Sequence, residues 1–365
     1  MIDGGTPDTY HKFLKSEIKN LIDKAEKLDL VVCTHMDYDH IGGLVKMLLD
    51  VDSKMISEFW YNGFLQVINK YCNPNVNTTL DNDKKIIDDI IFKGTGYSFN
   101  QEISIKDAFS LGILLLENNI KINSITNGRA LSTDYVRKPV EIGKNTKIIV
   151  LGPSKKRIKL LDNYWKKDML SRNFKFSIDD RYKLTEAFEY QLQILKQSYA
   201  LEELSISNIN NLEKYIGSLN EIDSSVTNGS SISFILEHNK KKYLFLGDAI
   251  IDDEILGELE NAVGYEYRFE IIKMPHHGSR YNVSQEFINR YKANDYYFLT
   301  NSKRFNHPDL EVIAEIICSD SLHKNIIFNY PIKKAKFLEN NQWKQKYNYD
   351  VTIGTGTKLI ERSYI

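Results

Sequence analysis

The sequence of 365 residues has little cysteine and no excess of charge of either sign. Its three cysteines, Cys33, Cys72 and Cys318, are too few and too scattered for a disulfide framework or a cysteine-rich zinc site. Lysine and arginine total 48 against 49 aspartates and glutamates, a formal net charge of −1. This balance argues against a nucleic-acid affinity that rests on global positive charge, although it leaves room for a local basic groove.

The sequence also lacks a long apolar run and a leader segment. Its densest apolar stretch, Leu111–Leu116, is ended by Glu117, so no run reaches the roughly 20 residues that a membrane span needs. The N-terminus does not have the basic and then apolar layout of a signal peptide. With 42% hydrophobic and 27% charged residues, the composition is that of a folded globular protein. We therefore expect no membrane segment, a reducing compartment and a cytoplasmic location.

Short buried strands alternate with polar loops and amphipathic helices, which predicts an α/β fold. The predicted strands are Leu30–Cys33, Lys147–Leu151, Phe269–Met274 and Tyr296–Leu299. Two further runs, Ser231–Glu237 and Lys242–Leu246, flank a turn signal and predict a hairpin. Helices are expected near Ile255–Leu259 and Leu310–Ile317, and a strand-rich tail over Ile326–Ile365.

Two less regular regions interrupt this plan. The first contains an Asn-rich stretch, Asn73–Asn82, and helical periodicity over Ile103–Leu116, and the second carries Lys/Glu helical patterning. We interpret the regions at about 54–145 and 155–225 as insertions, the second of them helical. The chain is then one domain over residues 1–365.

Four side chains that can bind a metal ion fall within six residues after the first buried strand. They are His35, Asp37, Asp39 and His40. Their alternation lets His35 and Asp37 reach one ion while Asp39 and His40 reach a second. Imidazole and carboxylate ligands suit Zn, Mn or Fe, and the absence of thiolate disfavours a purely structural zinc site. The alternative is an ordinary charged surface loop.

Polar residues also follow three later strands, where the loops of layered α/β folds assemble active sites. These residues are Asp248, the pair His276 and His277, and His307. Each has a structural alternative. Asp248 could cap a helix that starts at Ile250, the histidine pair could form a turn before Gly278, and His307 could stiffen a loop before a proline.

The ordered motifs together resemble the metallo-β-lactamase superfamily of hydrolases. The nearest likeness is to the metallo-hydrolase domain of bacterial competence DNA-uptake channel proteins and its stand-alone relatives. The segments that carry it are Ile2–Gly5, Thr34–Gly43, Leu151–Ser154, Leu246–Asp248, Lys273–Ser279 and Asn306–Pro308. The resemblance implies an αββα sandwich with helical insertions and with metals at one edge, where strand-end loops meet.

For the site, the resemblance implies two divalent cations, Zn or Mn with Mg as a further option. Asp248 would bridge them, and His276 or His277 would complete the second position with Asp39 and His40. Asp37 stands where many members of the superfamily have histidine, and the usual histidine ahead of the bridging aspartate is missing. Because oxygen ligands favour harder cations, this departure favours Mn or Mg alongside or instead of Zn.

A pair of cations would acidify a bridging water and stabilise charge on the attacking and leaving oxygens, which suits phosphodiester hydrolysis. Asp37 or Asp39 would orient the nucleophile. The histidine of the pair that does not bind metal, with His277 our choice, or else His307, would protonate the leaving group. Asp3 and Thr34 would orient ligands.

Our leading hypothesis is a metal-dependent phosphodiesterase or nuclease, with nucleic acid or another phosphodiester as the substrate. Lysines and arginine at Lys155–Arg157, with Lys159, Lys166 and Lys167, could guide a phosphate-rich polymer, or could form a solvated helix face. Two alternatives stay open: hydrolysis of a small ester, thioester or lactam, and a non-catalytic metal-binding sensor or assembly domain. Relatives usually have a hairpin ahead of Ile2–Gly5, so we also expect self-association or a partner chain at that open sheet edge.

Overall fold

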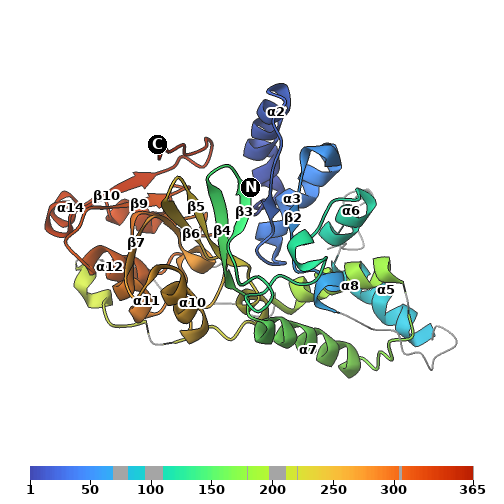
Figure 1. The fold of residues 1–365 in the computed structure, drawn as a ribbon. Coiled ribbons are helices and arrows are strands. Elements are labelled where there is room, and N and C mark those ends of the chain that lie inside the picture. Colours follow the sequence, from blue (N-terminus) through green and yellow to red (C-terminus); the bar gives the residue numbers. More distant parts are fainter. Residues whose placement is uncertain are drawn as a thin grey trace. The chain divides into compact units, whose positions relative to one another are not determined.

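The structure is a computed structural model that describes residues 1–68, 81–94, 110–178, 180–196, 211–219, 221–303 and 306–364. The chain divides into two compact units (Figure 1). The first unit comprises Met1–Val136 and Pro153–Ala200, and the second comprises Arg137–Gly152 and Leu201–Ile365. Each unit has its own sheet and is described by itself, and the expected single domain over 1–365 stays a prediction.

A small parallel sheet lies within the first unit. Strand β1 (Val31–Val32) pairs in parallel with β2 (Phe59–Trp60), and both strands are fully buried. Single parallel bridges extend the sheet at both edges, from Ile2 to Val32 and from Ile122 to Phe59. Because β2 belongs to this sheet, the first of the expected insertions contributes directly to the core of the unit.

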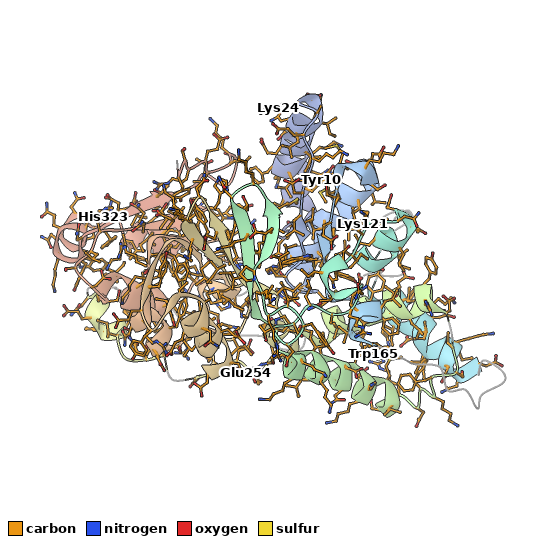
Figure 2. All side chains as sticks on the ribbon, viewed as in Figure 1. Tyr10, Lys24, Lys121, Trp165, Glu254 and His323 are labelled. Atoms are coloured by element: carbon orange, nitrogen blue, oxygen red, sulfur yellow. The ribbon has the colours of Figure 1, made fainter. Side chains whose placement is uncertain are left out.

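Helices surround this sheet. They are α1 (Pro7–Thr9), η1 (Tyr10–Leu14), α2 (Lys15–Asp23), α3 (Tyr38–Asp50), η2 (Ser53–Met55), α4 (Phe64–Val67), α5 (Asp81–Gly94), α6 (Leu111–Glu117), η4 (Ser124–Thr126), α7 (Lys155–Ser171) and α8 (Arg181–Lys196). Trp165 of α7, labelled in Figure 2, is buried against the rings of Phe64 and Phe188. This aromatic contact joins α4, α7 and α8, and α7 and α8 make the described first part of the charged second insertion helical, as its patterning predicts.

An eight-stranded sheet forms the second unit. Its strands are β3 (Val140–Gly143), β4 (Thr146–Gly152), β5 (Ser233–His238), β6 (Lys241–Phe245), β7 (Tyr267–Lys273), β8 (Tyr291–Phe298), β9 (Lys324–Phe328) and β10 (Tyr349–Ile353). They lie in the order β10-β9-β8-β7-β6-β5-β4-β3. The pairs from β3 to β6 are antiparallel, and those from β6 to β10 are parallel. The carboxyl ends of β6, β7 and β8 therefore meet at one edge of the sheet.

Three helices pack on one face of this sheet (Figure 1): α10 (Asp253–Val263), α11 (Gln285–Arg290) and α12 (Leu310–Cys318). The other helical segments are η5 (Leu212–Tyr215), α9 (Val226–Gly229), η6 (Pro275–Gly278), α13 (Lys333–Phe337) and α14 (Asn341–Tyr347). The core between sheet and helices includes Phe269, Phe298 and Ile313, all with no exposed surface. In the described part of the chain, no helix is both long enough and apolar enough to cross a membrane.

Several sequence predictions are confirmed. The hairpin is formed by β5 and β6, and the helices expected near Ile255–Leu259 and Leu310–Ile317 are α10 and α12. Helix α6 confirms the end of the periodicity over Ile103–Leu116, while residues 73–80 of the Asn-rich stretch and residues 103–109 lie outside the described residues.

Two other expectations are wrong. The tail is not strand-rich throughout, because α13 and α14 lie between β9 and β10. Ile332, Ala335 and Leu338 recur at the three-residue spacing of a helix, and all three are buried in the core. Nor does Asp248 cap a helix, because α10 begins at Asp253 and its N-cap side chain is that of Asp252.

Two glycine motifs of the first unit meet backbone to backbone. Gly4 N donates to His40 O and Gly43 N donates to Gly5 O, both at 2.8 Å. A Cβ atom on Gly43 would lie 1.9 Å from Gly4 O, closer than any real contact. Only glycine permits this approach, which joins the segment before β1 to α3 and places Asp3 beside His40.

We expect Gly43→Ala to lower the free energy of unfolding by about 1–3 kcal/mol, because the added methyl group forces the two backbones apart. Urea unfolding measures this change. Gly257→Ala is the matched control, since Gly257 lies in α10 with open space around its Cβ position. That substitution should stabilise the protein by up to about 1 kcal/mol. A Gly43→Ala protein as stable as the wild type would contradict the packing described.

A fully buried carboxylate supports the first unit at the start of α6. Glu189 of α8 accepts hydrogen bonds from Leu111 N at 2.9 Å, from Gly112 N at 2.7 Å and from the hydroxyl group of Tyr61. The two amides belong to the first turn of α6, where N–H groups have no partner within the helix. Burial raises the pKa of Glu189 to about 7, and the three donors offset only part of this effect.

The stability of the protein should therefore depend on the ionisation of Glu189. Its folded-state pKa of about 7 lies above the ordinary value of 4.5, so the folded state binds more protons between these values. The contribution of Glu189 to stability should fall by about 3 kcal/mol as the pH rises from 4.5 to above 7. Urea unfolding from pH 5 to pH 8 measures this contribution as the difference in the free energy of unfolding between the wild type and Glu189→Gln. A difference that does not change with pH would contradict this account.

Candidate metal centre

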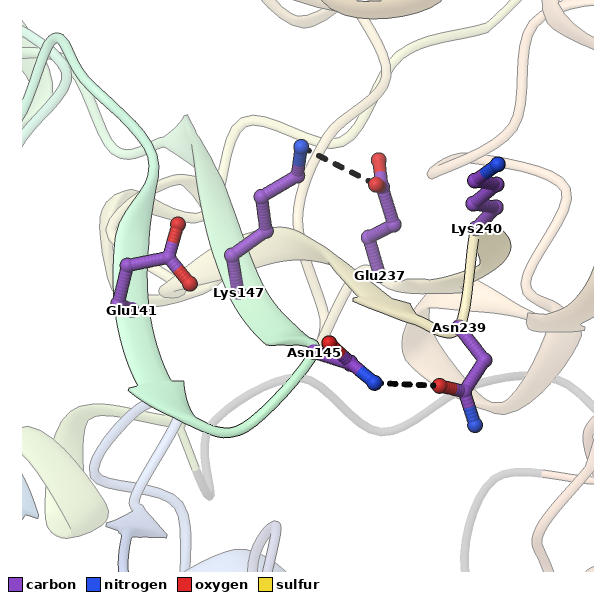
Figure 3. A pocket seen from close by; sticks show the side chains of 6 residues that line it. All are labelled: Glu141, Asn145, Lys147, Glu237, Asn239 and Lys240. Carbon is purple, nitrogen blue, oxygen red and sulfur yellow. Dashed lines mark hydrogen bonds and ion pairs between the residues drawn. The ribbon is translucent and has the colours of Figure 1, made fainter.

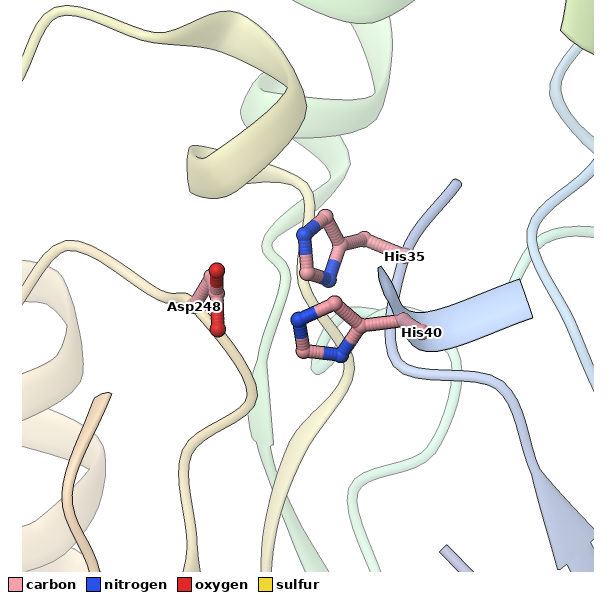
Figure 4. Close-up of side chains that lie close together, drawn as sticks. All are labelled: His35, His40 and Asp248. Carbon is pink, nitrogen blue, oxygen red and sulfur yellow. The ribbon is translucent and has the colours of Figure 1, made fainter. Parts of the chain in front are cut away.

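The histidine and aspartate motif of the first unit connects β1 to α3. Strand β1 ends at Val32, and α3 begins at Tyr38, so Asp39 and His40 lie in the first helical turn. His35, Asp37 and His40 are buried. The rings of His35 and His40 lie side by side, with centroids 4.1 Å apart (Figure 4). The motif is therefore an inward-facing cluster, and the alternative of an ordinary surface loop is wrong.

Asp3 fixes the orientation of both imidazoles. Its Oδ2 atom accepts from Thr34 Oγ1 and lies 2.8 Å from His40 Nδ1, while its Oδ1 atom accepts from Thr34 N. An ionised carboxylate can only accept, so His40 carries its proton on Nδ1. Thr34 Oγ1 gives its proton to Asp3 and so accepts from His35 Nδ1, which lies 3.1 Å away. Both rings thus have Nε2 available as a ligand atom.

The pKa of Asp3 reflects the same contacts. Burial acts to raise the pKa of Asp3, but the charge and hydrogen bond of His40 and the amide of Thr34 outweigh burial and hold that pKa below its usual value. Each Nε2 atom faces a carboxylate of the same loop: His35 Nε2 lies 3.1 Å from Asp37 Oδ2, and His40 Nε2 lies 3.8 Å from Asp39 Oδ2. Imidazole nitrogens beside carboxylate oxygens form a donor set that fits a divalent cation.

The second unit presents His276 and His277 at the carboxyl end of a parallel strand. Asp248 follows β6, His276 and His277 lie in η6 after β7, and Leu299 follows β8. His276 N donates to Gly247 O at 3.1 Å, and this bond ties the loop after β7 to the loop after β6. The parallel register of the three strands therefore places these residues together, as the sequence predicts for strand-end residues.

The two oxygens of Asp248, a residue also drawn in Figure 4, face different groups. Oδ2 lies 3.8 Å from His276 Nε2 and 3.9 Å from His277 Nε2. Oδ1 lies 3.5 Å from Nζ of the buried Lys273, which also donates to Gly247 O at 2.7 Å. Lys273 thus provides a positive charge on one side of the carboxylate, while the side that faces the imidazoles fits a cation.

Both histidines of the pair are held through Nδ1. His276 Nδ1 lies 2.7 Å from Asn282 Oδ1, and His277 Nδ1 donates to the carbonyl oxygen of Leu299 at 2.7 Å. His276 and His277 have positive φ angles of 44° and 56°, a left-handed conformation that costs energy for residues other than glycine. These hydrogen bonds help to hold the strained turn. The alternative of a turn without a ligand role does not explain why both Nε2 atoms face Asp248.

His307 lies against the same loop of the second unit. Its ring centroid is 5.1 Å from that of His276, and its Nδ1 atom is 3.6 Å from Asp309 Oδ2. Burial acts to raise the pKa of Asp309, but the hydrogen bond and charge of His307 outweigh it and lower that pKa. The buried Lys334 donates to the carbonyl oxygens of Asn306 and Pro308 on either side of the histidine. The His307 imidazole is therefore buried, and the contacts of Asp309 and Lys334 fix its position.

A separate surface pocket of the second unit is polar and lies at the ends of two hairpins (Figure 3). Its lining residues are Glu141, Asn145, Lys147, Glu237, Asn239 and Lys240. Lys147 pairs with Glu237 at 3.0 Å, and Asn145 donates to Asn239 at 3.2 Å. Because these four side chains pair with one another, we assign the pocket no chemistry of its own.

The comparisons with known proteins give one family match, which covers the first motif. The family model for the metallo-beta-lactamase superfamily matches residues 1–49, which include Asp3, β1, the histidine and aspartate loop and most of α3. A search of curated proteins gives no significant match. Since the superfamily generally consists of hydrolytic metalloenzymes, the match suggests a metal-dependent hydrolase.

Reasoning from the sequence did not single out three polar residues that contact these loops: Lys273, Asn282 and Asp309. Lys273 and Asn282 lie within or just after the segment Lys273–Ser279, and Asp309 lies two residues after His307. Their nearness to histidine was the available signal. Their contacts depend on which loops the strands bring together, and the sequence pattern does not carry that information.

We expect Asp3→Asn to weaken Mn²⁺ or Zn²⁺ binding about 10–100-fold, because an amide cannot accept at both positions that the carboxylate occupies. Isothermal titration calorimetry measures the dissociation constant. Asp50→Asn is the matched control, since Asp50 also accepts two side-chain hydrogen bonds in the first unit, from Tyr10 and Lys15. Equal metal affinity in the Asp3→Asn and Asp50→Asn proteins would refute the orienting role of Asp3.

Proposed function

We propose that the protein is a metal-dependent phosphodiesterase or nuclease, similar to the competence-type metallo-hydrolases. One observation carries the metal part of this proposal. Four histidines, His35, His40, His276 and His277, each have Nδ1 hydrogen-bonded inside their own unit and Nε2 beside a carboxylate. Ligand histidines in metalloproteins typically show this arrangement.

The ligands we propose are those that the sequence predicts. The first unit would contribute His35, Asp37, Asp39 and His40, and the second would contribute Asp248, His276 and His277. The proposal that both sets serve one reaction in an αββα sandwich rests on the order of the motifs and on the superfamily match over residues 1–49. Two divalent cations bound there would supply an acidified water and stabilise the charge that develops on the phosphodiester oxygens.

The chain's own residues then have separate tasks. Asp37 and Asp39 are the carboxylates next to the ligand imidazoles, and we assign them the orientation of the nucleophile. Because His276 and His277 both present Nε2 to Asp248, we assign the leaving-group proton to His307. The carboxylate of Asp309, 3.6 Å from Nδ1, would hold the His307 ring in place for this task.

Helix α7 supports a phosphate-rich substrate. Lys155, Lys156 and Arg157 occupy its first turn, directly after the N-cap Ser154. Positive side chains at a helix N-terminus oppose the helix dipole, so they do not help the helix to fold. Helix stability therefore does not account for these three basic residues, and their charge would attract an anionic polymer.

The test is cleavage of single-stranded DNA, double-stranded DNA, RNA and a generic phosphodiester in Mn²⁺, Mg²⁺ or Zn²⁺. We expect metal-dependent cleavage that falls at least about 100-fold in both Asp39→Ala and Asp248→Ala, because each removes a charged ligand. Asp253→Ala is the control, since Asp253 is an exposed aspartate of the first turn of α10. The Asp253→Ala protein should cleave at the wild-type rate.

Two results would contradict the proposal, and each would favour a different class of protein. Hydrolysis of a small ester, thioester or lactam without phosphodiester cleavage would identify a small-molecule hydrolase. Metal binding with no hydrolysis of either substrate type, and with partner binding intact in an Asp37→Ala and Asp39→Ala double variant, would identify a sensor or assembly domain.

A further inference from the structure

Asn282 joins three segments of the second unit beneath the candidate ligands. It lies between η6 and α11 and has no exposed surface. Its Oδ1 atom is 2.7 Å from His276 Nδ1, and its Nδ2 atom donates to the carbonyl oxygen of Asp248 at 3.1 Å. The same Nδ2 atom lies 3.3 Å from Asp223 Oδ2. One amide therefore contacts both the loop after β6 and the loop after β7.

Asp223 determines which atoms of this cluster donate hydrogen bonds and which accept them. A carboxylate and a backbone carbonyl oxygen can only accept, so the side of Asn282 that faces Asp223 and Asp248 must be its NH₂ group. The oxygen of the amide then faces His276, and the ring must carry its proton on Nδ1. In the neutral ring Nε2 of His276 then keeps its lone pair, and this is the atom that faces Asp248 Oδ2 at 3.8 Å.

A competing contact is weaker. Asn228 Nδ2 lies 3.3 Å from His276 Nδ1, and it would donate to that nitrogen if the ring were protonated on Nε2 instead. The Asn228 amide has a second proton besides the one it donates to Asp223 Oδ2 at 2.6 Å, but the Asn282 oxygen is 0.6 Å nearer to the ring than Asn228 Nδ2 is. The shorter contact requires the proton on Nδ1, so Asp223 fixes Asn282 and Asn282 fixes His276.

We propose that Asn282 is a positioning residue that sets the tautomer of His276 and holds the Asp248 loop against it. The proposal rests on the metal-binding role of His276 and Asp248 in the function proposed above. Asn282 is not itself one of the proposed ligands and acts through His276 and Asp248. Its effect is to prepare Nε2 of His276 as a ligand before any cation arrives.

The first test reads the tautomer in metal-free protein by two-bond ¹H–¹⁵N spectra of histidine-labelled samples, with His276 assigned through His276→Gln. We expect a proton on Nδ1 in the wild type and a mixture of tautomers in Asn282→Ala. Asn282→Asp keeps the acceptor but replaces the NH₂ group, so it should lose stability yet retain the Nδ1 proton. A purely structural role would not separate these two variants.

The second test is titration with Mn²⁺ by calorimetry. Asn282→Ala should weaken binding about 10–100-fold, with Asn282→Asp closer to the wild type. Asn294→Ala is the matched control, since Asn294 also makes two side-chain hydrogen bonds in the second unit, to Arg268 and Glu270. Its Mn²⁺ affinity should equal that of the wild type.

The inference is overturned if His276 carries its proton on Nε2 in the wild type, or if Asn282→Ala changes neither the tautomer nor the Mn²⁺ affinity. Failure of the proposed function looks different. Wild-type protein with the Nδ1 tautomer and Mn²⁺ binding, but without phosphodiester cleavage, would refute the phosphodiesterase and leave the role of Asn282 in place.

Discussion

The hydrogen bond between Asp3 and His40 is the contact on which the candidate site of the first unit depends. It exists because glycines at Gly4 and Gly43 let two backbones approach more closely than any side chain would allow. The carboxylate that this approach delivers can only accept, so it determines the proton position on His40 and, through Thr34, on His35. The close packing of the two backbones therefore determines that Nε2, and not Nδ1, of His40 is the atom available as a ligand.

The second unit reaches the same result with different residues. A buried amide takes the place of the carboxylate for His276, and the backbone carbonyl oxygen of Leu299 does so for His277. The strained left-handed turn that carries both rings is consistent with a functional site, because such conformations persist where the surroundings hold them. Two unrelated local structures that both present Nε2 beside a carboxylate are more easily explained by cation binding than by folding requirements alone.

Much of this arrangement could be predicted from the sequence, for identifiable reasons. Apolar runs that end abruptly in histidine and aspartate, as at Cys33 and Met274, locate both the strand and the polar residues at its end. The hairpin of β5 and β6 has a clear turn signal. By contrast, α13 and α14 are short, and the helical spacing of Ile332, Ala335 and Leu338 is a weak signal between two strands. Asn282 and Asp309 acquire their roles only through contacts between loops, which spacing along the chain does not reveal.

The central claim is that these histidines and aspartates bind divalent cations. Elemental analysis of the purified chain after equilibration with Mn²⁺ or Zn²⁺ and removal of free metal tests it most directly. The account predicts about two ions per chain, with retention reduced in both His40→Ala and His276→Ala. A correctly folded wild-type chain that retains neither metal would contradict the claim, whatever hydrolytic activity it showed.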